Sequence, residues 1–208
     1  MEWSGKTMRW LEIIMYFVTL NLLWIFGFVL GLGALGFFPA SFALFNIFYD
    51  GELFETQNRI LPLIKRYIAY YLKFFIKANC IGAVYTVLLL ICYFNFTVMK
   101  QQALLQALFI IPTILLLMYI LETAVFFSPV MIAGDGDIRS KIKLIITSPL
   151  LLSKVSVLNI AIAITSSTIA YLLPISLILL LVSVTIFVMN KITLQALYGK
   201  EILIKTTV

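Results

Sequence analysis

Two long charge-free stretches decide the fold of this chain. Residues 13–49 read IIMYFVTLNLLWIFGFVLGLGALGFFPASFALFNIFY, and residues 155–190 read VSVLNIAIAITSSTIAYLLPISLILLLVSVTIFVMN. Each is too long for one membrane-spanning helix, because about 20 apolar residues cross the ~30 Å hydrocarbon core of a bilayer. Each also has helix breakers near its middle, at Gly31–Pro39 and at Pro174. We therefore predict that each stretch forms a hairpin of two short helices.

Two further apolar runs lie between these stretches. Residues 78–99 and 101–121 are each long enough for one span, and the short turn Lys100–Gln102 separates them. The whole chain is 63% hydrophobic and only 12% charged, whereas soluble domains are about 25% charged. The composition therefore predicts a single, all-α domain, a polytopic bundle of transmembrane helices over residues 1–208.

The predicted bundle has six helical segments. Pro39 can begin the second, which is short and is tolerable in a membrane only if protein covers it; if the Gly31–Pro39 break is not a full turn, five segments remain. The predicted spans cover approximately residues 11–31, 37–49, 78–99, 104–133, 155–172 and 174–190, with a cytoplasmic amphipathic helix at 59–77 and a cytoplasmic basic segment at 138–154.

The basic residues predict the orientation. The formal net charge is +6, and six spans place fourteen of the fifteen lysines and arginines on one side, leaving only Lys100 on the other. Five spans would divide them twelve to three, which the positive-inside rule favours less. We therefore expect both termini in the cytoplasm and a multi-pass protein of the cell membrane. This charge pattern explains the basic character without a nucleic-acid partner.

The segment 59–77 separates its charges from its apolar side chains. Ile60, Ile64, Tyr67 and Tyr71 recur at helical spacing, and basic residues occupy the opposite side. One interpretation is a helix that lies on the inner membrane surface, where it binds anionic lipid. The other is a cytoplasmic extension of the next span that packs on its neighbours.

Glu122 is the one charged residue that falls inside a predicted span. An intramembrane carboxyl group is a candidate functional site by default, either as a neutral hydrogen-bond donor or in a proton relay. The alternative is that Glu122 lies closer to the inner interface. Its candidate polar neighbours are Asn21, Asn95, Thr123, Ser166 and Thr168.

Other motifs give weaker indications. The hydroxyls of Thr165–Thr168 line a polar path or bond their own helix, and the small residues of GFVLG (27–31) favour close helix packing. The chain has no histidine and two cysteines, which excludes a Cys/His metal centre. It lacks the GxSxG, Walker A and HExxH patterns. We therefore expect no enzyme activity, catalytic residue, metal or cofactor.

The steps NLLW (21–24) and GFFPA (36–40) resemble the YesL-like family of bacterial integral membrane proteins of unknown function. The matched positions Asn21, Trp24, Gly36, Pro39 and Ala40 are structural signatures under this resemblance. It implies a location in the bacterial cytoplasmic membrane and an accessory role beside carbohydrate-uptake systems, with ABC-transporter subunits as partners. Glu122 falls on no pattern of that family. The rival hypothesis is a small transporter or substrate-binding membrane component, in which Glu122 and Thr165–Thr168 face one midplane cavity.

Overall fold

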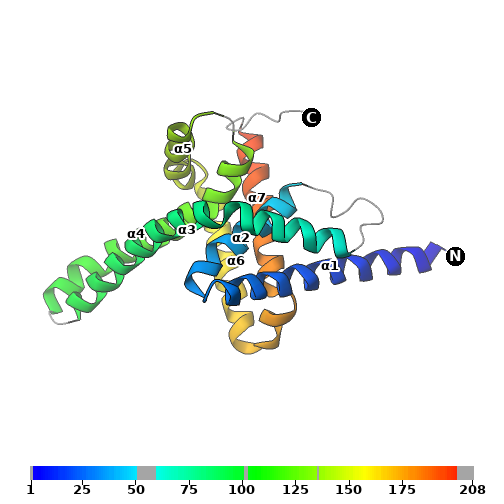
Figure 1. Ribbon diagram of the computed structural model, residues 1–208. Coiled ribbons are helices and arrows are strands. Elements are labelled where there is room, and N and C mark those ends of the chain that lie inside the picture. Colours follow the sequence, from blue (N-terminus) through cyan, green and yellow to red (C-terminus); the bar gives the residue numbers. More distant parts are fainter. Residues whose placement is uncertain (1, 51–59, 101–102, 135, 201–208) are drawn as a thin grey trace.

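The computed structural model describes residues 2–50, 60–100, 103–134 and 136–200, and no strand occurs in them. The first residue of the predicted amphipathic helix (59) and the predicted turn at 101–102 lie outside the described residues. The helices are α1 (Glu2–Leu30), α2 (Ala34–Tyr49), α3 (Ile60–Met99), α4 (Ala103–Ala133), α5 (Ile138–Leu151), α6 (Ser153–Leu172), the π-helical turn η2 (Leu177–Leu181) and α7 (Val182–Gly199) (Figure 1).

Five helical stretches are long and apolar enough to cross a membrane, by length and composition. This confirms the predicted all-helical class with membrane-spanning helices, whereas the orientation of the termini stays a prediction. The sixth predicted segment is the shorter apolar helix α2. The five stretches are Met8–Leu30, Ile60–Met99, Gln106–Ala133, Ser153–Leu172 and Leu177–Gly199.

A tight turn ends α1 and reverses the chain. The N–H of Gly33 donates to the carbonyl of Phe28 (2.9 Å), and the N–H of Leu32 donates to Val29 (3.0 Å). These two bonds are those of a Schellman motif, which requires a left-handed residue after the helix. Leu32 takes that conformation with φ 54°. Because this turn already reverses the chain, α2 begins at Ala34, earlier than the predicted start near Pro39.

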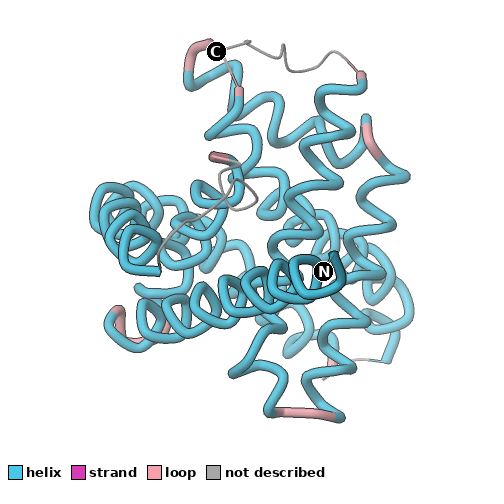
Figure 2. Tube along the Cα trace, turned by 90° about the vertical axis from the view of Figure 1, so that its right-hand side faces the viewer, coloured by secondary structure: helices cyan, strands magenta, loops and turns pink. Residues whose placement is uncertain are grey.

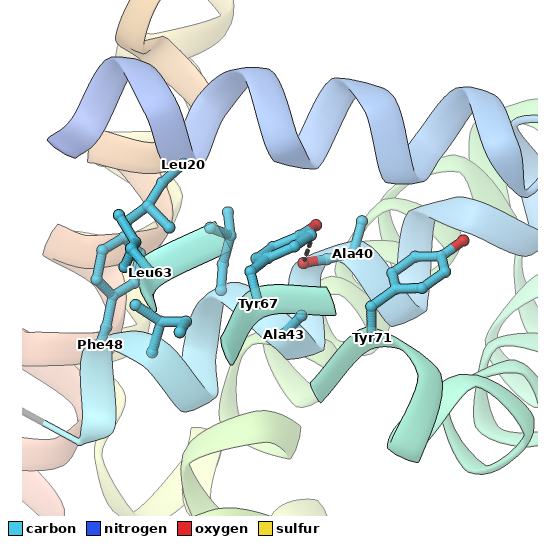
Figure 3. Packing of buried hydrophobic residues seen from close by; sticks show 9 residues of the cluster. Leu20, Ala40, Ala43, Phe48, Leu63, Tyr67 and Tyr71 are labelled. Atoms are coloured by element: carbon cyan, nitrogen blue, oxygen red, sulfur yellow. Dashed lines mark hydrogen bonds between the residues drawn. The ribbon is translucent and has the colours of Figure 1, made fainter. Parts of the chain in front are cut away.

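Helix α2 lies in the centre of the molecule and contacts α1, α3, α4 and α7. Its side chains are buried on every face from residue 42 to residue 48, as expected of a helix that is apolar all round. Figure 3 shows Ala40 and Ala43 of α2 beside Tyr67 of α3, in one cluster with Leu20 of α1. The surrounding helices therefore cover this short apolar segment.

Helix α3 is one continuous helix of 40 residues. It unites the segment predicted as a separate amphipathic helix at 59–77 with the span predicted at 78–99. Leu63, Tyr67 and Tyr71 of its first half pack against α1 and α2 (Figure 3), while Lys65 and Lys73 are exposed. The first half thus packs on its neighbours as an extension of the span, and its contact with a membrane surface stays a prediction.

The remaining helices form two hairpins and a short connection. The far halves of α3 and α4 extend away from the other helices, and α6 and α7 run across the direction of α1 and α3 (Figure 1). In the view turned by 90°, the N-terminal end of α1 lies at the front of the molecule (Figure 2). Helix α5 begins at the cap Asp137, whose side chain accepts from the N–H of Ile138 (2.8 Å). Thus α5 and the first residues of α6 occupy the predicted basic segment 138–154.

Candidate functional site

A cavity of about 930 Å³ lies where the hairpins meet. Its walls come from α1, α2, α3, α4, α6, η2 and α7, so no single hairpin contains it. Most of the lining is apolar, and aromatic rings dominate the side formed by α1, α2 and α3. The lining aromatic residues are Trp24, Phe37, Phe38, Phe42, Phe45, Tyr85, Phe127 and Tyr171.

The rings on the aromatic side of the cavity contact one another in a continuous series. Phe37 meets Trp24 edge to face at 5.8 Å between ring centroids, and it meets Phe38 in the same manner at 5.3 Å. Phe38 stacks on Tyr85 of α3 at 6.3 Å. Mutual contact fixes the orientation of these side chains, because aromatic pairs prefer such edge and offset geometries.

Glu122 lies in the wall that α4 contributes. Its side chain is 5% exposed, and its Oε2 atom has no hydrogen-bond partner among the described residues. Its carboxyl group faces Ser156 and Asn159 of α6. Burial of an ionised carboxyl group in a membrane protein costs roughly 3 kcal/mol or more without a compensating charge. The low exposed fraction of Glu122 shows that its side chain lies within the protein. A functional role would require this position.

A buried polar cluster extends from Glu122 toward α7. Asn159 and Thr193 are both fully buried, and the amide of Asn159 donates to the Thr193 hydroxyl at 3.3 Å. The Oδ1 atoms of Asn159 and Asn190 have no partner among the described residues. Sequence analysis missed these three residues and Ser156. Their spacing is a usable signal, because Ser156 and Asn159 on α6, like Asn190 and Thr193 on α7, lie three residues apart on one helical face.

The hydroxyl groups of α6 had two predicted roles, lining a polar path and bonding their own helix, and both roles occur. Ser166, Ser167 and Thr168 line the cavity together with Glu122. Ser166 shares a 2.8 Å hydrogen bond with Thr185 of α7. Ser167 and Thr168 donate to carbonyl oxygens of their own helix, at 2.8 and 2.9 Å. The structure thus brings Glu122, Ser166 and Thr168 to one cavity, whereas Thr165 is exposed outside the lining and donates to the Ala161 carbonyl at 2.8 Å. The arrangement of the substrate-binding hypothesis is therefore met in part.

The other predicted polar neighbours are placed differently. Asn95 is exposed on the far half of α3 and does not line the cavity. Thr123 is buried, and its hydroxyl donates to the Ile120 carbonyl of its own helix at 2.7 Å. Asn21 is fully buried but outside the lining, where it holds the π-helical turn.

Asn21 binds three backbone groups of the segment that joins η2 to α7. Its amide donates to the carbonyls of Leu177 (2.7 Å) and Ile178 (2.8 Å), and its Oδ1 accepts from the N–H of Ser183 (3.0 Å). A π-helical turn disrupts the regular helical ladder, and a buried backbone group without a partner is costly. Asn21 therefore stabilises the turn from which Leu177 and Leu181 enter the cavity wall.

The remaining signature residues join α1, α2 and α3. The indole of Trp24 donates to the Ser41 hydroxyl at 3.0 Å, and its ring lines the cavity. Pro39 and Ala40 are buried, and the Ala40 carbonyl accepts from the Tyr67 hydroxyl at 3.3 Å. Gly36 packs directly on the backbone of α1. These positions support the predicted structural role, and Trp24 also contributes to the cavity.

No group of three or more histidine, cysteine, aspartate or glutamate side chains gathers to hold a metal ion in the part of the chain that the structure describes. Along the cavity, the described lining includes one carboxyl group, several hydroxyls and no lysine, arginine or cysteine. Such a site can accept hydrogen bonds and bind apolar surface. It contains no pairing of a nucleophile with a base.

Comparisons with known proteins place the first part of the chain beside uncharacterised bacterial proteins. The family described as "Protein of unknown function, DUF624" matches residues 17–96, which cover the second half of α1, all of α2 and nearly all of α3. The chain is 35% identical over 91 residues to the uncharacterized protein YteU of Bacillus subtilis (strain 168). That alignment covers 44% of this chain and 40% of the relative. No solved structure matches the chain.

The matched region contains the aromatic side of the cavity but not its carboxyl group. Trp24, Phe38 and Tyr85 fall within residues 17–96, whereas Glu122 and the whole of α6 fall outside. This similarity supports a relation to an uncharacterised family, and it assigns no function to the site.

Proposed function

We propose that the protein is a multi-pass protein of a bacterial cytoplasmic membrane that binds a small, largely apolar molecule inside its helical bundle. The observation that carries this proposal is the cavity of about 930 Å³. Ligand pockets typically measure about 300–1,000 Å³, with apolar walls and a few convergent polar groups. The cavity has this composition, with Glu122, Ser166 and Thr168 as the polar groups.

Binding without catalysis is part of this proposal. Glu122 is the one carboxyl group among the described lining residues, and two of the hydroxyls in the wall already donate to backbone carbonyls. General acid–base or nucleophilic chemistry needs a donor–acceptor pair within hydrogen-bonding reach of the substrate. The arrangement is better suited to hold a molecule than to transform it.

A neutral fluorescent probe tests the proposal directly. In nanodiscs, the protein with Trp3→Phe and Trp10→Phe keeps Trp24 as its one tryptophan, and Trp24 lines the cavity. N-phenyl-1-naphthylamine should quench Trp24 by energy transfer in a saturable manner. If the quenching of Trp24 does not saturate, and rises only in proportion to the probe that partitions into the lipid of empty nanodiscs, a binding site is excluded.

A matched pair of substitutions places the probe inside the cavity. Ala163 and Ala161 are both exposed on α6, but Ala163 lines the cavity and Ala161 lies outside the lining. Ala163→Phe fills part of the cavity and should weaken probe binding at least tenfold. Ala161→Phe adds the same side chain and should leave the affinity unchanged. Equal effects of the two substitutions would contradict binding in the cavity.

We further propose an accessory role in carbohydrate uptake as the physiological setting. The support is the resemblance of NLLW and GFFPA to the YesL-like family, together with exposed basic side chains on α3 and α5 that suit an anionic lipid surface or a transporter subunit. These side chains include Lys65, Lys73, Arg139 and Lys143. Affinity purification in mild detergent should enrich ABC-transporter subunits. Recovery of the protein without them would count against this setting.

A further inference from the structure

We infer that the ligand of the cavity is a lipophilic organic cation whose positive charge lies at Glu122. This inference rests on the proposed binding function and specifies its ligand class. It follows from two features: a buried carboxyl oxygen of Glu122 that has no partner among the described residues, and a wall of aromatic rings that lines the same cavity.

The first feature is the buried carboxyl group of Glu122. Glu122 Oε2 and Asn159 Oδ1 are both buried acceptors without a partner among the described residues. The nearby Ser156 hydroxyl donates to the Pro149 carbonyl at 3.0 Å, and the Asn159 amide donates to Thr193. The side chains of Asn159 and Ser156 also lie within hydrogen-bonding reach of the Glu122 carboxyl group, but its Oε2 atom is left without a partner among the described residues, so a ligand that brings a positive charge or an N–H donor would complement it.

No basic side chain neutralises this carboxyl group from the cavity side. The lining contains neither lysine nor arginine in the described part of the chain. Ionisable residues inside membrane proteins usually pair with one another or with a ligand or ion. Since Glu122 is 5% exposed and belongs to the cavity lining, a cation in the cavity is a partner that its position allows.

The second feature selects an organic cation over a metal ion. Hard metal ions bind six or more oxygen ligands or ordered waters, which this largely apolar cavity does not offer. Trp24, Phe37 and Phe38 form part of a continuous aromatic wall. Aromatic faces attract quaternary ammonium and similar cations, most strongly where water is excluded. A ligand with an apolar body and a delocalised positive charge would suit both the aromatic wall and Glu122.

Three probes of different charge test the inference. Tetraphenylphosphonium is a lipophilic cation, tetraphenylborate is an anion of the same shape, and N-phenyl-1-naphthylamine is neutral at pH 7. In nanodiscs of zwitterionic phosphatidylcholine, the cation should bind at least tenfold more tightly than the anion. The zwitterionic lipid removes the surface charge, and affinities are compared after correction for partition into empty nanodiscs, because the interfacial dipole potential still favours the anion in the lipid.

Glu122→Gln removes the negative charge and keeps the shape of the side chain. This variant should bind the cation at least tenfold more weakly and bind the neutral probe as before, which also shows that the cavity is intact. Glu12→Gln is the matched control, because Glu12 is exposed on α1 and outside the cavity; it should leave binding of all three probes unchanged.

The outcomes separate the inference from the proposed function. If the neutral probe binds but the cation shows no preference over the anion, or keeps its affinity in the Glu122→Gln protein, the inference is wrong and the cavity function stands. If sodium chloride replaces the cation at constant ionic strength, an inorganic ion occupies the site and the inference is also wrong. If none of the probes binds saturably, both the proposed function and the inference are wrong.

Discussion

Single residues in this protein hold together segments that are far apart in the sequence. Asn21 on α1 binds Leu177, Ile178 and Ser183, more than 150 residues away. The Ser183 hydroxyl donates back to the Phe17 carbonyl of α1 at 3.0 Å. Together these bonds join the first helix to the π-helical turn before α7, so the stability of that turn depends on one amide side chain.

We predict that Asn21→Leu destabilises the protein by about 2–3 kcal/mol. Leucine keeps the branching at Cγ but leaves two carbonyls and one N–H without their partner, and each buried unsatisfied group costs about 1–3 kcal/mol before local rearrangement. Thermal unfolding in nanodiscs, followed by tryptophan fluorescence, measures the change. Thr19→Val is the control, because the Thr19 hydroxyl only donates to the Met15 carbonyl of its own helix. Equal melting temperatures for the two variants would contradict the prediction.

At the scale of helices, the sequence predicts breaks better than continuity. The breaks near Gly31 and Pro174 are visible because glycine and proline act locally on the backbone. The joining of segments 59–77 and 78–99 into α3 is one of two interpretations that the sequence leaves open, because the change from charged to apolar residues at Ala78 alters the surroundings of a helix without ending it. The early start of α2 depends on the Schellman turn, which in this chain contains a left-handed leucine instead of the usual glycine.

The α1–α2 hairpin depends on a close backbone contact at Gly36. A Cβ atom there would overlap the carbonyl oxygens of Gly27 and Phe28, and backbone atoms cannot rotate away as a flexible side chain can. We predict that Gly36→Ala destabilises the protein by about 1–3 kcal/mol, the usual cost of overpacking. The same thermal unfolding measurement applies. Gly199→Ala, where a Cβ would meet nothing within 4 Å, should be neutral; a loss of equal size there would refute the packing explanation.

At the scale of the whole molecule, composition predicts the class of fold but not the site. Apolar runs reveal helices because hydrophobicity is a property of consecutive residues. The cavity is different, because its walls come from seven helical elements and only their packing brings Trp24, Glu122 and Ser166 together. The sequence could identify Glu122 as a candidate because a carboxylate is conspicuous in an apolar run. The three-residue spacings to Ser156 and Asn190 could mark Asn159 and Thr193 as polar positions on one helical face, but only packing brings these two residues together.

The orientation of the chain is the prediction that concerns the molecule as a whole. If α1 and α2 form a hairpin that enters and returns, the turn at Leu32 and the α3–α4 tip at Lys100 lie on the same side of the membrane. The sixteen residues of α2 would span about 24 Å as a helix, less than the ~30 Å core, and α2 is covered by its neighbours. A short return through the protein interior is therefore physically acceptable.

Single cysteines on a background with Cys80→Ala and Cys92→Ala measure this orientation. We predict that Leu32→Cys and Lys100→Cys react with a membrane-impermeant maleimide in intact cells, because both positions are exposed and lie on the outer side in the six-segment arrangement. Lys154→Cys should react only after permeabilisation, since the positive-inside rule places it in the cytoplasm. Reaction of Lys100→Cys but not Leu32→Cys in intact cells would show that the turn after α1 does not reach the outer side. Reaction of Lys154→Cys in intact cells would show that the chain has the opposite orientation in the membrane.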